Sequence, residues 1–183
     1  IEASHSADIG CVRLTERSLP SDPATEQERA DAERVAREVL DEAFAAVDCS
    51  GARTWVGVAG TVTTLSALVQ ELPSYDPAAI HLSRISRGQI GETTSWLLGM
   101  PHEKRAALGP MHPGRVDVIG GGAVVVEILA AELADIVEIT RSLAEVCELD
   151  KVREVLDAAA GFQLLPHGTL AFSGKEGQRR WNR

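Results

Sequence analysis

The stretch RTWVGVAGTVTTL, residues 53–65, decides the fold. Its apolar residues 55–58 are typical of a buried strand, and a turn with a glycine at Gly60 follows them. From Thr61 onward, apolar side chains recur at helical spacing as far as Leu72, before a proline ends the pattern. The stretch therefore predicts a strand, a glycine turn and a helix, which together form the building unit of an α/β domain.

The same order of elements recurs at residues 116–133. The letters VDVI predict a strand at 116–119, GGG predicts a glycine loop at 120–122, and an apolar helix follows. A helix that starts at such a turn leaves its first N–H groups unpaired, and its dipole favours negative charge there. We therefore expect both glycine turns to bind phosphate groups.

The candidate phosphate-binding residues of the two turns are Gly57, Gly60, Thr61, Gly120, Gly121 and Gly122. The glycines allow a ligand to approach the backbone, and the Thr61 hydroxyl can donate to a phosphate oxygen. Neither turn has the GxGxxG or GxxxxGK[ST] pattern, so the fingerprints of the Rossmann and P-loop folds are missing. Tight packing is the alternative interpretation of either turn taken singly.

Two arginines are further candidates for contact with an anion. Arg115 precedes the second predicted strand, and Arg13 lies within a short strand predicted at residues 9–14. An ordinary surface position is the alternative interpretation of each arginine. Helical spacing also predicts a helix over residues 22–47, beginning at an Asp-Pro pair, and another over residues 86–98.

Composition excludes several classes of protein. The chain has 183 residues, a formal net charge of -9 and three cysteines without CxxC spacing. These features argue against nucleic-acid binding and a disulfide framework, and we expect a cytoplasmic protein without a membrane span. No HExxH or GxSxG motif occurs, so we expect no catalytic residue and no metal ligand in this chain. Because the first residue is isoleucine, we expect a fragment of a longer protein.

Three segments in order carry a resemblance to a known family. They are DIGCVRLTER at 8–17, GVAGTVTTL at 57–65 and PGRVDVIGGG at 113–122. Together they resemble the exopolyphosphatase / guanosine pentaphosphate phosphatase family, especially its actinobacterial members. The resemblance implies two actin-like (ribonuclease H-like) domains that enclose a cleft, and release of terminal phosphate from polyphosphate with a divalent metal.

The resemblance implies that this chain is most of the second domain. The fold class is then α/β, an incomplete ribonuclease H-like second domain with a mixed sheet flanked by helices. It would occupy residues 1–135, and residues 136–183 would form a divergent, helical C-terminal segment and tail. The catalytic glutamate, and the residues that bind Mg²⁺, would lie mainly outside the chain. The implied partners are inorganic polyphosphate or guanosine pentaphosphate and the missing N-terminal domain, with a homodimer left open.

Two other functions remain open from the sequence. The same turns would serve a non-catalytic module that binds polyphosphate or a nucleotide. They would also serve an ATP-using protein of the actin-like superfamily, such as a sugar kinase, because fold does not determine function.

Overall fold

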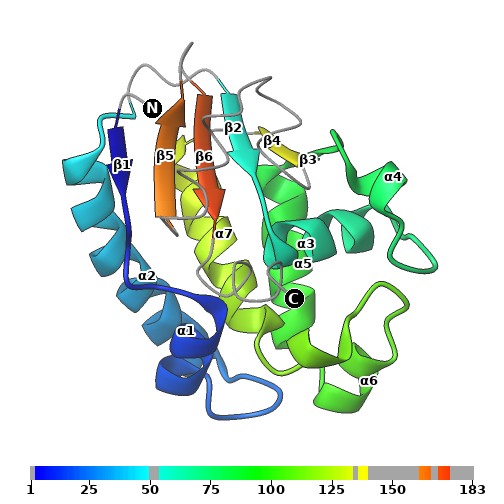
Figure 1. Cartoon of the computed structure of the whole chain (residues 1–183). Coiled ribbons are helices and arrows are strands. Elements are labelled where there is room, and N and C mark those ends of the chain that lie inside the picture. Colours follow the sequence, from blue (N-terminus) through cyan, green and yellow to red (C-terminus); the bar gives the residue numbers. More distant parts are fainter. Residues whose placement is uncertain (1–2, 50–53, 134–135, 140–160, 166–168, 174–183) are drawn as a thin grey trace.

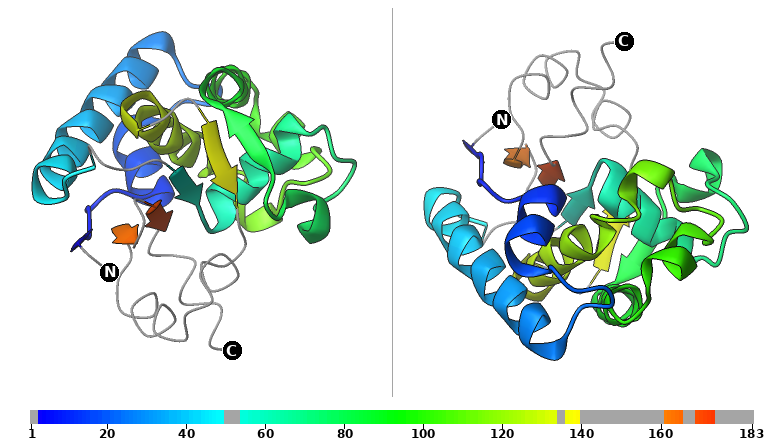
Figure 2. Two further views of the ribbon diagram at one scale, coloured as in Figure 1. Left: turned by 90° about the horizontal axis from the view of Figure 1, so that it is seen from above. Right: turned by 90° about the horizontal axis from the view of Figure 1, so that it is seen from below.

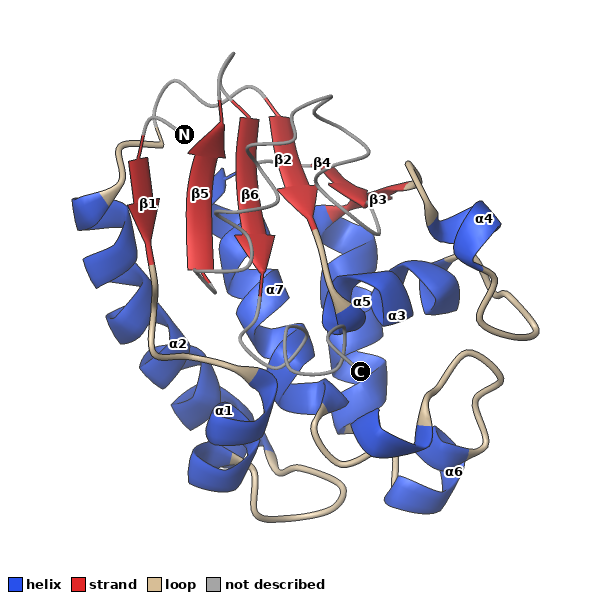
Figure 3. Ribbon diagram, in the orientation of Figure 1, coloured by secondary structure: helices blue, strands red, loops and turns tan. Residues whose placement is uncertain are grey.

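The computed structural model describes residues 3–49, 54–133, 136–139, 161–165 and 169–173. In this part of the chain six strands form one sheet in the order β1-β5-β6-β2-β4-β3 (Figure 3). They are β1 (Ala3–His5), β2 (Thr54–Gly57), β3 (Arg84–Ser86), β4 (Ile136–Ile139), β5 (Gly161–Leu165) and β6 (Thr169–Ser173). The central strand β2 pairs in parallel with β4 and β6, whereas the outer pairs are antiparallel.

The helices gather mainly on one face of this sheet, where α2, α7 and α5 lie side by side (Figures 1 and 2). The longer ones are α1 (Cys11–Ser18), α2 (Glu26–Ala46), α3 (Gly60–Val69), α5 (Arg87–Leu98) and α7 (Ile119–Leu133). The short ones are α4 (Pro77–Ile80), α6 (His102–Ala106) and the 3-10 turn η1 (Pro113–Arg115). The core between sheet and helices contains Trp55, Leu65 and Leu129, each at most 1% exposed.

Helix starts follow local capping chemistry. Thr25 caps α2 by accepting from the Glu28 N–H, and the Glu28 carboxylate accepts from the Thr25 N–H at 2.6 Å in return. Ser86 and Gln89 form the same reciprocal pair at the start of α5. The helix predicted from residue 22 therefore begins four residues later, at Glu26, because the capping box is at Thr25. The helix predicted over 86–98 is confirmed within a residue at its start.

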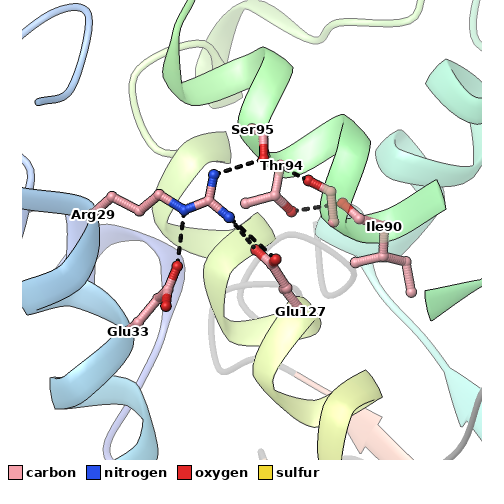
Figure 4. Close-up of polar contacts among 7 residues, drawn as sticks. Arg29, Glu33, Ile90, Thr94, Ser95 and Glu127 are labelled. Carbon is pink, nitrogen blue, oxygen red and sulfur yellow. Dashed lines mark hydrogen bonds and ion pairs between the residues drawn. The ribbon is translucent and has the colours of Figure 1, made fainter. Parts of the chain in front are cut away.

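An ion-pair network joins the three helices behind the sheet (Figure 4). Arg29 of α2 donates to Glu33 at 2.8 Å, to Ser95 of α5 at 2.6 Å and to Glu127 of α7 at 3.2 Å. Burial raises the pKa of Glu127, although the Arg29 charge opposes that rise. The network fixes α2 and α5 against α7, the helix whose first turn carries the three glycines.

Two strand predictions are wrong. Residues 11–18 form helix α1 after an extended Gly10, because Leu14 and Ser18, one helical turn apart, are buried together. Residues 116–118 form a turn after η1, and 119–122 are the start of α7, where the Gly122 N–H donates to the Val118 carbonyl. A short apolar run fits a buried helix as well as a buried strand, so spacing alone misassigned it. The three glycines are therefore not a loop.

The C-terminal part also differs from expectation. A helical segment and tail are predicted over residues 136–183, but residues 136–139 form strand β4. Within residues 136–183, all the described elements are strands of the sheet that contains β2, so the expected helical segment is wrong there. Residues 140–160 and the expected tail at 174–183 lie outside the described residues.

Candidate anion site at the start of α3

The turn between β2 and α3 is the strained part of the candidate site. Gly57 ends β2, and Ala59 has φ 74° and ψ -175°, a conformation that residues other than glycine rarely adopt. No side chain caps α3, which begins at Gly60. Because the first N–H groups of a helix have no partner within it, this start presents backbone donors and a positive dipole end.

Two threonine hydroxyls hold the first turn of α3. The Thr63 hydroxyl donates to the Ala59 carbonyl at 3.1 Å, and the Thr64 hydroxyl donates to the Gly60 carbonyl at 2.8 Å. Both bonds end on carbonyl oxygens, so neither uses the N–H donors of Gly60 and Thr61. The two hydroxyls thereby hold the first turn of α3 on its acceptor side.

The guanidinium of Arg115 lies against Gly60. A Cβ added at Gly60 would meet the Arg115 Nη2 at 2.3 Å and its Cζ and Nε at 2.5 Å. Arg115 Nη1 also donates to the Thr64 hydroxyl at 3.3 Å. A cation beside the positive end of a helix is unfavourable unless an anion lies with them, since both attract negative charge. The pair is therefore a candidate site for an anion, and the missing side chain at Gly60 makes room for the Arg115 guanidinium.

The first turns of three helices meet beside this site. A Cβ at Gly122 of α7 would meet the Thr61 Oγ1 of α3 at 2.7 Å and the Cβ of Cys11 of α1 at 3.1 Å. One at Gly121 would meet the Thr15 Oγ1 at 2.4 Å and the Cys11 carbonyl at 2.8 Å. These two glycines allow close helix packing, which is the alternative that the sequence left open for them.

Gly120 faces the opposite side of the same turn. A Cβ there would meet the end of the Leu98 side chain at 2.9 Å. Gly120 and Gly121 also line a surface hollow of about 250 Å³, together with Thr15, Arg105 and Asp117. The structure thus brings Gly60, Thr61, Gly122 and Arg115 together and places Gly120 at the edge of that group.

Arg13 lies elsewhere. It is on α1 and pairs with Asp8, and both side chains are 67% exposed. Its neighbours in a second hollow include Arg17, Leu14 and Val35, and the residues lining that hollow do not include Gly60 or Arg115. The structure does not join Arg13 to the candidate anion site.

Sequence reasoning missed Thr64 and Arg105. Thr64 follows Gly60 at the four-residue spacing that lets a hydroxyl reach a helical carbonyl, so a signal existed. Arg105 is 8% exposed and donates to the Val116 carbonyl at 3.1 Å. Its partners are mainly backbone carbonyls, and no sequence motif indicates a side chain that binds backbone carbonyls.

A metal ion needs several donor side chains close together. Within the described ranges, no three His, Cys, Asp or Glu side chains come close enough to hold a metal ion. The described residues therefore do not fit the divalent metal that the resemblance implies. Among these same residues, no helix combines the length and apolar character needed to cross a membrane.

The fold is that of an α/β domain built around a parallel strand, a glycine turn and an uncapped helix, with Arg115 at the start of that helix. Residues 1–146 match the Ppx/GppA phosphatase family, and the chain belongs to this family. The match extends beyond the expected boundary at residue 135 and includes β4.

Relatives agree with this assignment. The chain is 60% identical over 135 residues to Exopolyphosphatase 2 of Mycobacterium tuberculosis, covering 74% of this chain and 42% of that protein. A solved structure of an exopolyphosphatase-like protein matches with a TM-score of 0.76 and 36% identity, over 84% of this chain and 52% of that one. A Ppx/GppA family member from Aquifex aeolicus matches with a TM-score of 0.65 and 28% identity, over 81% of this chain and 47% of that one. The chain thus spans about half the length of these relatives, and the likeness implies an actin-like fold.

Proposed function

We propose that the chain is the phosphate-binding part of a phosphohydrolase that removes terminal phosphate from inorganic polyphosphate or guanosine pentaphosphate. The observation that carries this proposal is the Arg115 guanidinium against Gly60 at the uncapped start of α3. The guanidinium and the positive end of the helix lie side by side there, so both can face the same bound phosphoryl group. The 60% identity to a protein named Exopolyphosphatase 2 supports polyphosphate as the substrate class.

Each residue of the proposed site has a separate role. The N–H groups of Gly60 and Thr61 donate to phosphoryl oxygens, and the guanidinium of Arg115 balances their charge. The Thr61 hydroxyl, which lies against Gly122, is a further donor. Gly57 gives the ligand access to the turn and Gly120 gives it access to the start of α7, while Gly121 and Gly122 allow α7 to pack closely against α1 and α3. Arg13 is left out of the proposed site because the structure places it in another hollow.

The reaction needs groups that this chain does not supply. Water would attack the terminal phosphorus, the bond to the bridging oxygen would break, and the shortened chain would leave with that oxygen. In this proposal, the carboxylate that orients the water and the ligands of Mg²⁺ come from the other actin-like domain. The proposal places the domain at residues 1–135 extended by the strands of 136–173. We place the reaction in the cytoplasm, because the cysteine pattern argues against an oxidising compartment.

Phosphate release measured on the full-length protein that contains this chain tests the proposal. With tripolyphosphate and Mg²⁺, Arg115→Ala should lower kcat/KM about 10²-fold, the effect typical of losing one donor to a developing anion. Arg34→Ala is the matched control, because Arg34 is an exposed arginine of α2 that pairs only with Asp31 and Glu38 among the described residues. Hydrolysis that survives Arg115→Ala unchanged overturns the proposed site.

Two further outcomes separate the alternatives. The 183-residue chain by itself should release no phosphate, and robust release by it would contradict a site completed by another domain. A full-length protein that binds tripolyphosphate without releasing phosphate would instead be a non-catalytic binding module. Parallel assays with guanosine pentaphosphate show which of the two substrates is preferred.

A further inference from the structure

Arg115 projects from a short turn that has little regular structure of its own. Within η1 and its flanks, the Arg115 N–H donates to the His112 carbonyl at 2.9 Å, and the Val118 N–H donates to the Arg115 carbonyl at 3.0 Å. A turn held by bonds of this local kind can shift as a body. Contacts from outside the turn must therefore fix where the Arg115 guanidinium lies.

Arg105 of α6 provides such contacts. Its Nε donates to the carbonyl of Val116, the residue next to Arg115, at 3.1 Å. Its Nη1 donates to the Met100 carbonyl and pairs with the Asp22 carboxylate at 2.7 Å. One planar guanidinium thus joins the turn, the connection that follows α5 and the connection between α1 and α2.

A second set of contacts supports the same turn. The other Asp22 oxygen accepts from the His102 N–H at 2.7 Å, and the His102 ring pairs with Asp117 at 3.2 Å. Burial opposes ionisation of Asp22, but the bonds from His102 and Arg105 outweigh it and lower the pKa of that carboxyl. The anchors contact residues 116 and 117, immediately after Arg115.

Stability alone is a weak reason for this arrangement. The Arg105 side chain is only 10% exposed, and buried ion pairs are often no more stabilising than apolar side chains of the same volume. A guanidinium with rigid donors, by contrast, fixes the relative positions of the groups that it joins. The contacts of Arg105 therefore fit a role in fixing the position of the turn that carries Arg115.

We propose that Arg105 is a positioning residue, which holds the turn 113–118 so that the Arg115 guanidinium stays against the start of α3. The proposal rests on the proposed function, because it assigns Arg105 to the same anion site. It predicts that Arg105 acts on phosphate chemistry only through Arg115. Lysine at position 105 keeps the charge beside Asp22 but lacks the planar fork that reaches both carbonyls.

A double-variant series in the full-length protein tests this coupling. Arg105→Lys should lower kcat/KM for tripolyphosphate about 10-fold or more, because small misplacements of a binding group lower rates steeply. Adding Arg105→Lys to Arg115→Ala should lower kcat/KM no further than Arg115→Ala alone. Arg34→Lys, on the exposed face of α2, is the matched control. Losses that multiply in the double variant overturn the proposal, because Arg105 would then act independently of Arg115.

The NMR signal of the Arg115 Nη1–H that donates to the Thr64 hydroxyl gives a readout that does not depend on activity. In the wild type this proton should exchange slowly with water, and in Arg105→Lys it should exchange as fast as in an exposed arginine. An unchanged rate overturns the proposal even if the enzyme assay fails. If the wild type neither binds nor hydrolyses tripolyphosphate, the proposed function fails. The exchange rate then decides by itself whether Arg105 positions Arg115. Should Arg105→Lys not fold, Asp22→Asn, which weakens the same anchor, is measured in the same way.

Discussion

The Gly60→Ala variant should lose phosphate chemistry while keeping nearly the stability of the wild type. The new Cβ would lie 2.3–2.5 Å from three atoms of the Arg115 guanidinium. Ordinary contacts between carbon atoms are about 3.5–4.0 Å, so the guanidinium must move by roughly 1 Å or more. Because the clashing atoms belong to the end of a flexible side chain, the backbone can stay in place.

The change in stability should be small. Alanine is favoured over glycine within a helix by up to about 1 kcal/mol. Loss of the Arg115–Thr64 hydrogen bond costs about 0.5–1.5 kcal/mol. These effects oppose each other, so the free energy of unfolding should change by less than about 1 kcal/mol. A displacement of about 1 Å at a binding group can nevertheless lower kcat/KM by about 10²-fold.

Alanine at Gly121 is the matched comparison. Its Cβ would lie 2.8 Å from the Cys11 carbonyl oxygen and 3.0 Å from the Thr15 nitrogen, both backbone atoms of α1. Relief of that clash requires α1 to move away from α7, and overpacking of this kind costs about 1–3 kcal/mol. Gly121→Ala should therefore be clearly less stable than Gly60→Ala.

Urea unfolding of the full-length protein gives the free energy of unfolding of each variant. Phosphate release from tripolyphosphate by the same protein gives its kcat/KM. The expected result is a Gly60→Ala variant of near wild-type stability and strongly reduced kcat/KM. If Gly60→Ala hydrolyses tripolyphosphate like the wild type, the turn at 57–61 is a packing turn and the reasoning is refuted. If Gly60→Ala unfolds as readily as Gly121→Ala, the backbone has moved to relieve the clash with Arg115. The small change predicted for the free energy of unfolding of Gly60→Ala is then wrong.

Two further predictions concern α2 and α7. Burial raises the pKa of Glu127 in the folded state, so the free energy of unfolding should fall as pH rises from the pKa of the unfolded state to that of the folded state. Glu127→Gln should abolish that fall in urea unfolding measured from about pH 4 to about pH 9. A fall that persists in Glu127→Gln would assign it to another group. Thr25→Ala removes the side-chain cap of α2 and should lower the free energy of unfolding by about 0.5–2 kcal/mol, measured by the same method. Equal stability of Thr25→Ala and the wild type would show that the capping box contributes nothing.

The strand and helix of residues 53–65 could be predicted because both of their signals are local. Trp55 and Val56 are buried in β2, Val58 is buried directly after it, and the helical spacing from Thr61 matches α3. The strand predicted at 116–119 is wrong because residues 116–118 form a turn and Ile119 begins α7, and a short apolar run does not by itself distinguish a strand from the start of a buried helix. The strand predicted at 9–14 is wrong because residues 11–18 form a helix that packs against α7, which is distant in sequence.

The candidate site was predictable to a similar degree. The helix start at Gly60 and Thr61 follows from the turn sequence, and Arg115 was a candidate by its charge. The contact between Gly60 and Arg115 joins positions 55 residues apart, so it is a property of the packed fold. Arg105 carries no sequence signal, because its hydrogen bonds to Val116 and Met100 end on backbone carbonyls.

A titration of the full-length protein with tripolyphosphate, followed by backbone amide NMR, tests the central claim most directly. The account predicts saturable shifts of the Gly60 and Thr61 amide signals, which Arg115→Ala weakens. Shifts centred instead on α1 around Arg13 and Arg17, with the Gly60 and Thr61 signals unmoved at saturation, would contradict it.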